Sequence, residues 1–172
     1  MTNWHLATST MAPWRPWLIH HGSLTRLLSS RFPDFNVRRL RQAFDLPYRD
    51  EVAPLGLGGH ERALVREVLL RSGSVPLVYA HTVIPSACLR GPWRQLAGLG
   101  NQSLGATLFA DPRVERFPLA FRRVSRRHPL YLAAAPYLTE PAAALWARRS
   151  QFALAGHRLM VTEVFLPSVI RP

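Results

Sequence analysis

The segment from residue 63 to 84 constrains the fold more than any other part of the chain. It contains two runs rich in valine and leucine, ALVREVLLR and LVYAHTVI, separated by the short sequence SGSVP. Aliphatic and β-branched runs of this length, joined by a turn that contains glycine, are typical of an antiparallel β-hairpin. The chain is therefore expected to be built on an antiparallel sheet and not on a parallel one.

Further strands and short helices are predicted on both sides of this hairpin. In chain order, they are a helix at 22–31 with Ser23 as its N-cap, a bulged exposed strand at 35–46, short helices at 92–99 and 103–110, a strand at 114–124 with a bulge or edge position at Pro118, a broken helix at 130–146, and a second hairpin with strands at 150–154 and 159–166. Helices inserted between neighbouring strand pairs indicate an α+β fold.

Length and composition fit one domain. With 172 residues, 48% of them hydrophobic, the chain can bury one core, so we expect a single domain over residues 1–172, with residues 1–19 poorly ordered. The lone cysteine, Cys88, leaves no disulfide within the chain and is expected to be a buried spectator in a loop. No apolar stretch approaches the roughly 20 residues that cross a bilayer, and the N-terminus lacks a signal-peptide pattern. A cytoplasmic location is therefore expected.

The net charge of +12 gives little support for a nucleic-acid partner. All 22 basic residues are arginines, and they are dispersed along the chain as single residues and pairs, without a continuous basic arm. Metal binding and hydrolase chemistry are not favoured either. The seven histidines are scattered and are expected at the surface or in loops, and no serine or cysteine nucleophile motif is present. We therefore expect neither a nucleic-acid partner nor a metal.

Two charged residues stand out because each lies in an otherwise apolar strand. Arg66 is flanked by Val65 and Glu67 in the first predicted hairpin, and Glu163 lies in the last predicted strand. Burying an unpaired ion costs several kcal/mol, about the stability of a small domain, so a buried charge must have a partner. Two interpretations remain open from the pattern: these side chains point to solvent or pair with each other, or they meet a ligand.

Six local motifs occur in the same order as in a known family. They are SLTRLL from residue 23, VREVLL from 65, TVIP from 82, SLGATLF from 103, LWARRS from 145 and TEVFLP from 162. Together they span about residues 20 to 168, and with them the chain resembles the chorismate pyruvate-lyases of ubiquinone biosynthesis. The position of Leu24 is more often methionine in that family, and the segment 126–144 looks longer than in its compact members.

The resemblance implies both a fold and a site. The implied fold is a single α+β domain with an antiparallel sheet of about six strands, helices packed on it, and two helical flaps over a buried ligand. It assigns Arg66 to the ligand carboxylate and Glu163 to the phenolic hydroxyl, as the catalytic pair. Backbone N–H groups near Leu24 and Leu104 complete the carboxylate site, and Gly105 allows close approach. No metal and no organic cofactor are implied.

The resemblance also implies a reaction, the conversion of chorismate to 4-hydroxybenzoate and pyruvate by a lyase, as the first committed step towards ubiquinone. The alternative is a non-catalytic sensor domain of the same fold that binds a small carboxylate. For the enzyme we expect the substrate and product as partners, a monomer, and transient contact with a membrane or a downstream prenyltransferase. Slow release of a deeply buried product is a further expectation.

Overall fold

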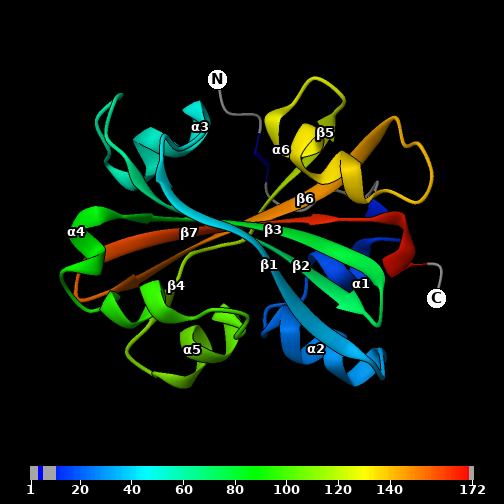
Figure 1. Cartoon of the computed structure of the whole chain (residues 1–172), viewed down its shortest axis with the longest axis horizontal. Coiled ribbons are helices and arrows are strands. Elements are labelled where there is room, and N and C mark those ends of the chain that lie inside the picture. The colour runs from blue at the N-terminus through cyan, green and yellow to red at the C-terminus, as the bar shows by residue number, and fades with distance from the viewer. Residues whose placement is uncertain (1–3, 6–10, 171–172) are drawn as a thin grey trace.

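A computed structural model describes residues 4–5 and 11–170 of the chain (Figure 1). Its elements alternate between strands and short helices. They are α1 (Arg15–Leu18), α2 (Leu24–Arg31), β1 (Phe35–Asp45), α3 (Arg49–Val52), η2 (Ala53–Leu55), β2 (Ala63–Ser72), β3 (Val75–Pro85), α4 (Ser86–Leu89), η3 (Arg94–Gly98), α5 (Leu104–Ala110), β4 (Glu115–Arg116), β5 (Ala120–Ser125), α6 (Pro129–Ala134), η4 (Ala135–Tyr137), β6 (Ala144–Leu154), β7 (His157–Phe165) and η5 (Pro167–Val169), where η marks a 3-10 helix.

The strands form one antiparallel sheet, which confirms the predicted α+β class. Within the described residues it has seven strands in the order β1-β2-β3-β7-β6-β4, and β5 also pairs with β6. Because one edge of β6 is taken by β7, the short strands β4 and β5 share its other edge in succession. The predicted number of about six therefore matches the six positions across the sheet, while the number of separate strands is seven.

The first predicted hairpin and the bulged first strand are confirmed, and the helices predicted at 22–31 and 103–110 are α2 and α5, which begin at Leu24 and Leu104. β2 and β3 pair antiparallel over their length, and the register of β1 against β2 shifts between Arg39 and Arg41. Ser23 caps α2 by accepting a hydrogen bond from the backbone N–H of Arg26. These elements could be predicted because strand alternation and N-cap residues are patterns of neighbouring residues in the sequence.

Four predictions need correction. β6 begins at residue 144, so the expected broken helix over 130–146 ends at 137 and the last hairpin starts six residues earlier than predicted. The predicted strand at 114–124 is two strands interrupted around Pro118, which cannot donate to a ladder. The predicted helix at 92–99 is the 3-10 helix η3. Cys88 is buried as expected, but it lies in the short helix α4 and not in a loop.

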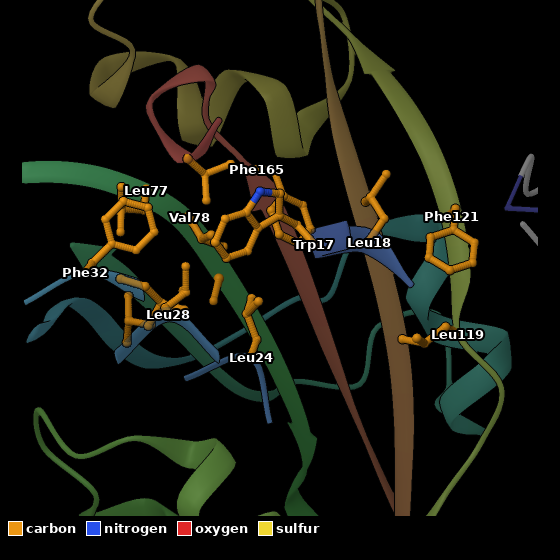
Figure 2. Close-up of a cluster of buried hydrophobic side chains, with 14 of the residues drawn as sticks. Trp17, Leu18, Leu24, Leu28, Phe32, Leu77, Val78, Leu119, Phe121 and Phe165 are labelled. Atoms are coloured by element: carbon orange, nitrogen blue, oxygen red, sulfur yellow. The ribbon is translucent and has the colours of Figure 1, made fainter. Parts of the chain in front are cut away.

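Each face of the sheet carries its own helices (Figure 1). Alternation along β2 sends Arg66 and Val68 to one face, where α2 and α5 pack, and Glu67 and Leu69 to the other, where α6 packs. The α2 face holds two apolar clusters. One surrounds Leu28 next to α2, and the other surrounds Leu104 next to α5 (Figure 2 shows the first). The space between these clusters is where a ligand site can form.

The N-terminal segment contributes to this core. Residues 1–3 and 6–10, part of the stretch that we expected to be poorly ordered, lie outside the described residues, as do 171–172. Residues 11–19 contain α1, and Met11 is buried in the cluster next to α2. Trp17 and Leu18 are buried in the same cluster (Figure 2). None of the helices in the described ranges has the length and apolar character needed to cross a bilayer.

Candidate active site

A cavity lies on the α2 face of the sheet, above the middle of its strands. The register places Arg66 of β2, Thr82 of β3, Val161 of β7 and Ser150 of β6 side by side in one row across the sheet. The structure brings all five predicted site residues to the wall of this cavity. They are Leu24, Arg66, Leu104, Gly105 and Glu163. They come from α2, β2, α5 and β7, so only the folded chain assembles them.

Arg66 is a buried cation without an anionic partner. Its side chain is 2% exposed, and its Nη2 donates to the backbone carbonyls of Gly100 at 3.2 Å and Gln102 at 2.8 Å. The buried Nε has no hydrogen-bond partner, and no carboxylate of the described residues lies within ion-pair distance of this guanidinium. Burial, reinforced by the nearby charge of Arg39, lowers the pKa of Arg66. An unpaired guanidinium of this kind favours binding of an anion.

Glu163 meets Arg148 and not Arg66, so the interpretation that the two candidate charges pair with each other is wrong. The Nε of Arg148 donates to Glu163 Oε2 at 2.5 Å across the β6–β7 register pair. The Nη1 of Arg148 donates to the carbonyl oxygens of Trp17 and His20, at 3.0 and 2.9 Å. Since Arg148 occupies one carboxylate oxygen, the other oxygen of Glu163 is left to meet a group in the cavity.

The helices α2 and α5 cover the cavity from the side opposite the sheet, and a direct contact links them. The Ser103 hydroxyl donates to Thr25 Oγ1 at 2.8 Å, which joins the start of α5 to the start of α2. A Cβ on Gly105 would lie 3.0 Å from Ser23 Oγ and 3.3 Å from Thr25 Oγ1. Glycine at this position therefore lets the two helices approach each other closely above the cavity.

Two further arginines line the cavity, and the sequence analysis did not single them out. Arg148 was missed because it lies between the predicted broken helix at 130–146 and the predicted strand at 150–154, although it belongs to the LWARRS motif. Arg116 lies in the two-residue strand β4, where its Nε and Nη2 donate to Ser150 Oγ at 3.2 and 2.8 Å. The pairing of Arg148 with Glu163 follows from the register of β6 against β7, which extends beyond the hairpin strands predicted from the sequence. Nothing in the sequence alone marks Arg116.

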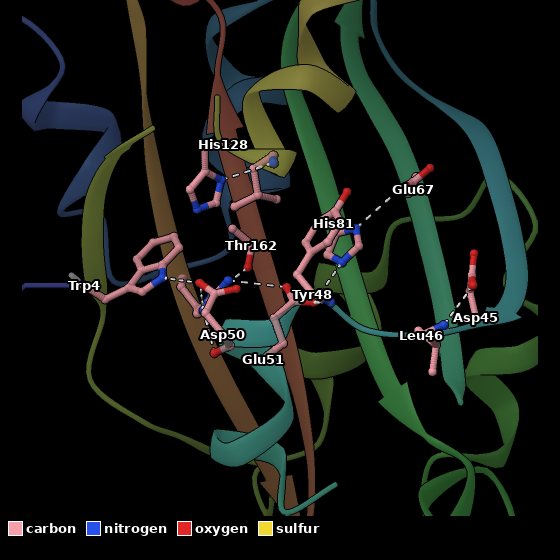
Figure 3. A network of polar contacts seen from close by, with 12 residues as sticks. Trp4, Asp45, Leu46, Tyr48, Asp50, Glu51, Glu67, His81, His128 and Thr162 are labelled. Carbon is pink, nitrogen blue, oxygen red and sulfur yellow. Dashed lines mark hydrogen bonds and ion pairs between the residues drawn. The ribbon is translucent and has the colours of Figure 1, made fainter. Parts of the chain in front are cut away.

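The opposite face of the sheet carries a second group of buried charges, and here every ion has a partner (Figure 3). His81 Nε2 lies 3.2 Å from Glu51 Oε2 and its Nδ1 lies 3.5 Å from Glu67 Oε1. Arg149 contacts Asp50 Oδ2 at 3.0 Å and Glu51 Oε1 at 3.3 Å. His81 is 2% exposed, so the expectation that every histidine lies at the surface or in a loop is wrong for this residue.

These ion pairs change the titration of His81. Burial alone would lower its pKa, but the contacts with Glu51 and Glu67 outweigh burial and raise the pKa to about 9. The imidazole is therefore charged at neutral pH and tied to two carboxylates, which is a structural arrangement. Among the residues that the structure describes, no cluster of histidine, cysteine and acidic side chains could hold a metal ion.

The sheet, its short helices and the cavity between them define a class of protein, α+β domains with a pocket on one face of an antiparallel sheet. Within this class, the chain belongs to the chorismate lyase family. A family model described as "Chorismate lyase" matches residues 4–171. The family resemblance drawn from the six sequence motifs is thereby confirmed.

Curated relatives agree with this assignment. A "Probable chorismate pyruvate-lyase" from Nitrosospira multiformis is 45% identical over 172 residues, which is 99% of this chain and 96% of the relative. Another protein with the same name, from Nitrosomonas europaea, is 46% identical, and the match covers 98% of this chain and 95% of that relative. A third, from Thiobacillus denitrificans, is 48% identical, and the match covers 92% of this chain and 84% of that relative.

Two solved structures with a similar fold share little sequence with this chain. The effector domain of PhnF from Mycobacterium smegmatis has a TM-score of 0.59 and 13% identity, covering 87% of this chain and 91% of that chain. The ligand-binding domain of a putative GntR-family transcriptional regulator from Bordetella bronchiseptica has a TM-score of 0.54 and 18% identity. The match covers 77% of this chain and 84% of that chain. At these identities the likeness concerns the fold alone.

Proposed function

We propose that this chain is a chorismate pyruvate-lyase, which converts chorismate to 4-hydroxybenzoate and pyruvate. The observation that carries the proposal is the buried Arg66, which has no carboxylate partner and faces the same cavity as Glu163. The names of the relatives support the same activity. The fold is shared with regulator domains, but the relatives at 40–48% identity are named as lyases, which favours the enzyme over the sensor.

In this proposal Arg66 binds the ring carboxylate of the substrate. A guanidinium is planar and permanently charged, so its N–H groups match the two oxygens of a carboxylate better than an ammonium group would. The Nε of Arg66 is free, and the two carbonyls that hold its Nη2 fix the orientation of the group. The N–H groups of Leu24 and Leu104 add to this site, since the first N–H groups of a helix have no partner within it.

Glu163 orients the C4 hydroxyl of the substrate through the carboxylate oxygen that Arg148 leaves open. In the reaction the C3–O ether bond breaks, the hydrogen at C4 moves to the methylene carbon of the enolpyruvyl group, and the ring becomes aromatic as pyruvate leaves. A six-membered cyclic transition state achieves this transfer within the substrate, so the protein contributes mainly by positioning the ring and excluding water. Gain of aromaticity drives the reaction forward without a strong acid or base.

The proposal is tested by incubating the purified chain with chorismate. Pyruvate release, coupled to lactate dehydrogenase, and the absorbance of 4-hydroxybenzoate should rise in equal amounts. Arg66→Ala should lose about 2 to 5 kcal/mol of affinity for 4-hydroxybenzoate, while Arg38→Ala, an exposed arginine on β1, should behave as wild type. Tight binding of 4-hydroxybenzoate by the wild type without pyruvate release would instead identify a sensor.

We also propose that the enzyme acts in the cytoplasm as a monomer without a nucleic-acid partner, and that its product feeds ubiquinone synthesis. The lone cysteine and the dispersed arginines support the location and the lack of a nucleic-acid partner. Transient contact with a membrane or a prenyltransferase would be consistent with the positive net charge of the chain. Ultracentrifugation with added duplex DNA, at low and moderate salt, tests the monomer and the lack of DNA binding together.

A further inference from the structure

The cavity contains more positive charge than a single carboxylate requires. Three arginines and one acid line it, namely Arg66, Arg116, Arg148 and Glu163. Arg148 is paired with Glu163, which leaves Arg66 and Arg116 without a carboxylate within ion-pair distance among the residues that the structure describes. Two unpaired cations in one enclosed site repel each other, so this arrangement is favourable only when anions bind.

Arg116 is held in place by neutral groups. Ser150 Oγ accepts from its Nε and Nη2, and the backbone carbonyl of His21 accepts from its Nη1. Its guanidinium carbon lies 5.3 Å from the ring centroid of Phe109 and 5.4 Å from that of Phe152. These contacts orient the guanidinium without neutralising it, and Nη1 and Nη2 each make one hydrogen bond within the described residues, which leaves each a second N–H for a ligand.

Arg116 remains charged at neutral pH. Burial, followed by the charge of Arg148, lowers its pKa to about 10, which is still well above neutrality. The other nearby charge is Glu163, which favours the charged form but is itself engaged by Arg148. The cation is therefore present, oriented and only partly hydrated in the ligand-free protein.

The two unpaired arginines approach the cavity from opposite ends. Arg66 and Ser150, the residue that holds Arg116, belong to the same row across the sheet and are separated by β3 and β7. At roughly 4.8 Å per strand spacing, their Cα atoms are about 14 Å apart. Glu163 lies on β7, two strands from Arg66, and pairs with Arg148 of β6, the strand that also carries Ser150. Arg116 is thus located on the Glu163 side of the cavity.

We infer that Arg116 is the receptor for a second carboxylate of the substrate, the one on the enolpyruvyl side chain. The inference rests on the proposed function. Chorismate carries one carboxylate on C1 of the ring and another on the ether at C3, next to the C4 hydroxyl. With the C1 carboxylate at Arg66 and the C4 hydroxyl at Glu163, the side chain at C3 extends to the Glu163 side, where Arg116 lies. The Ser150 hydroxyl can donate to the same carboxylate.

This assignment separates substrate recognition from product recognition. When the C3–O bond breaks, pyruvate carries the second carboxylate away, and 4-hydroxybenzoate keeps only the carboxylate at Arg66. Loss of Arg116 should therefore weaken the binding of chorismate and leave the binding of 4-hydroxybenzoate almost unchanged. Loss of Arg66 should weaken both. Few structural roles of an arginine would produce this difference between two ligands of one cavity.

The test compares Arg116→Gln with wild type, using Arg113→Gln as the matched control because Arg113 is exposed and three residues away. Single-turnover rates at rising enzyme concentration give the apparent affinity for chorismate, and titration calorimetry gives the affinity for 4-hydroxybenzoate. We expect Arg116→Gln to weaken chorismate binding about tenfold to a hundredfold, with 4-hydroxybenzoate binding within about twofold of wild type. Equal weakening of both ligands, or of neither, would overturn the assignment.

A chemical control covers a variant that loses stability. Chorismate methylated at the enolpyruvyl carboxylate lacks the second charge, so wild type should bind it as weakly as Arg116→Gln binds chorismate, and the variant should not discriminate between the two compounds. This forms a double cycle between protein and substrate. Equal discrimination by wild type and variant would refute the inference. Failure of the proposed function is seen separately, as the absence of pyruvate release by wild type.

Discussion

Replacing Glu163 by glutamine distinguishes an orienting role from that of a base. The amide keeps the shape of the side chain and an oxygen that can accept from Arg148 Nε, a contact of 2.5 Å in the structure. It loses the negative charge opposite Arg148, which is 1% exposed, so we expect a loss of about 2 kcal/mol of stability, as for a hydrogen bond to a charged group. Glu163→Ala removes the partner altogether and should cost about 3 to 5 kcal/mol.

The effect on turnover differs between the two roles. If Glu163 orients the C4 hydroxyl, Glu163→Gln should lower the rate of the chemical step by about tenfold or less, since a neutral hydrogen bond replaces a charge-assisted one. If Glu163 removed the hydrogen from C4, the loss would be about 10²- to 10⁴-fold. Single-turnover mixing with excess enzyme measures this step, because slow product release would mask it in the steady state. A loss beyond a hundredfold in a variant that melts like a folded protein and still binds 4-hydroxybenzoate would refute the orienting role.

Two further predictions concern the contact between α2 and α5 and the charges on the opposite face. Gly105→Ala should raise the Kd for 4-hydroxybenzoate about tenfold in calorimetry, because the new Cβ forces α2 and α5 apart; an unchanged Kd would show that their close approach does not matter for binding. The pKa of His81, about 9 against an ordinary 6.5, means that folding takes up protons between these values, so this stabilisation is complete below pH 6.5 and is lost as the pH rises through 9, by about 3 kcal/mol. Urea unfolding from pH 6 to 10 should show this loss of unfolding free energy in wild type and not in His81→Gln. The same dependence of the unfolding free energy on pH in both proteins would contradict the prediction.

The parts of the fold that could be predicted are those with a local physical signal. Alternation along β2 and β3, and the N-cap residues Ser23 and Ser103, lie within a few residues of the structure that they determine. The two candidate charges were also found in this way, because an ion in an apolar strand stands out against its neighbours. Local patterns therefore predicted the class of fold and the two ends of the candidate site.

The parts that were missed depend on contacts between distant segments. The start of β6 is rich in alanine and follows two prolines, so nothing local distinguishes it from a broken helix, and its strand conformation results from pairing with β5 and β7. Because the predicted strand started only at residue 150, Arg148, the partner of Glu163, was left outside every predicted strand. Arg116 was placed in the predicted strand at 114–124 but was not singled out there, and in the structure it lies in the two-residue strand β4. Its place in the cavity depends on Ser150, which is 34 positions away in the sequence.

Arg148 and Arg149 show how the partner of a buried arginine indicates its role. They are neighbours on β6 and therefore point to opposite faces of the sheet. Arg149 has the carboxylates of Asp50 and Glu51 and stacks at 4.1 Å on Trp4, so its charge is compensated within the protein and serves stability.

On the other face, Glu163 compensates Arg148, while Arg66 and Arg116 have only neutral acceptors. Burying an uncompensated cation lowers the stability of the ligand-free protein, and a chain retains such a cation where a ligand supplies the missing anion. The two uncompensated arginines match the two carboxylates of chorismate, whereas 4-hydroxybenzoate provides only one. The charge balance of the cavity is therefore complete with the substrate bound and incomplete with the product, which favours the exchange of product for new substrate.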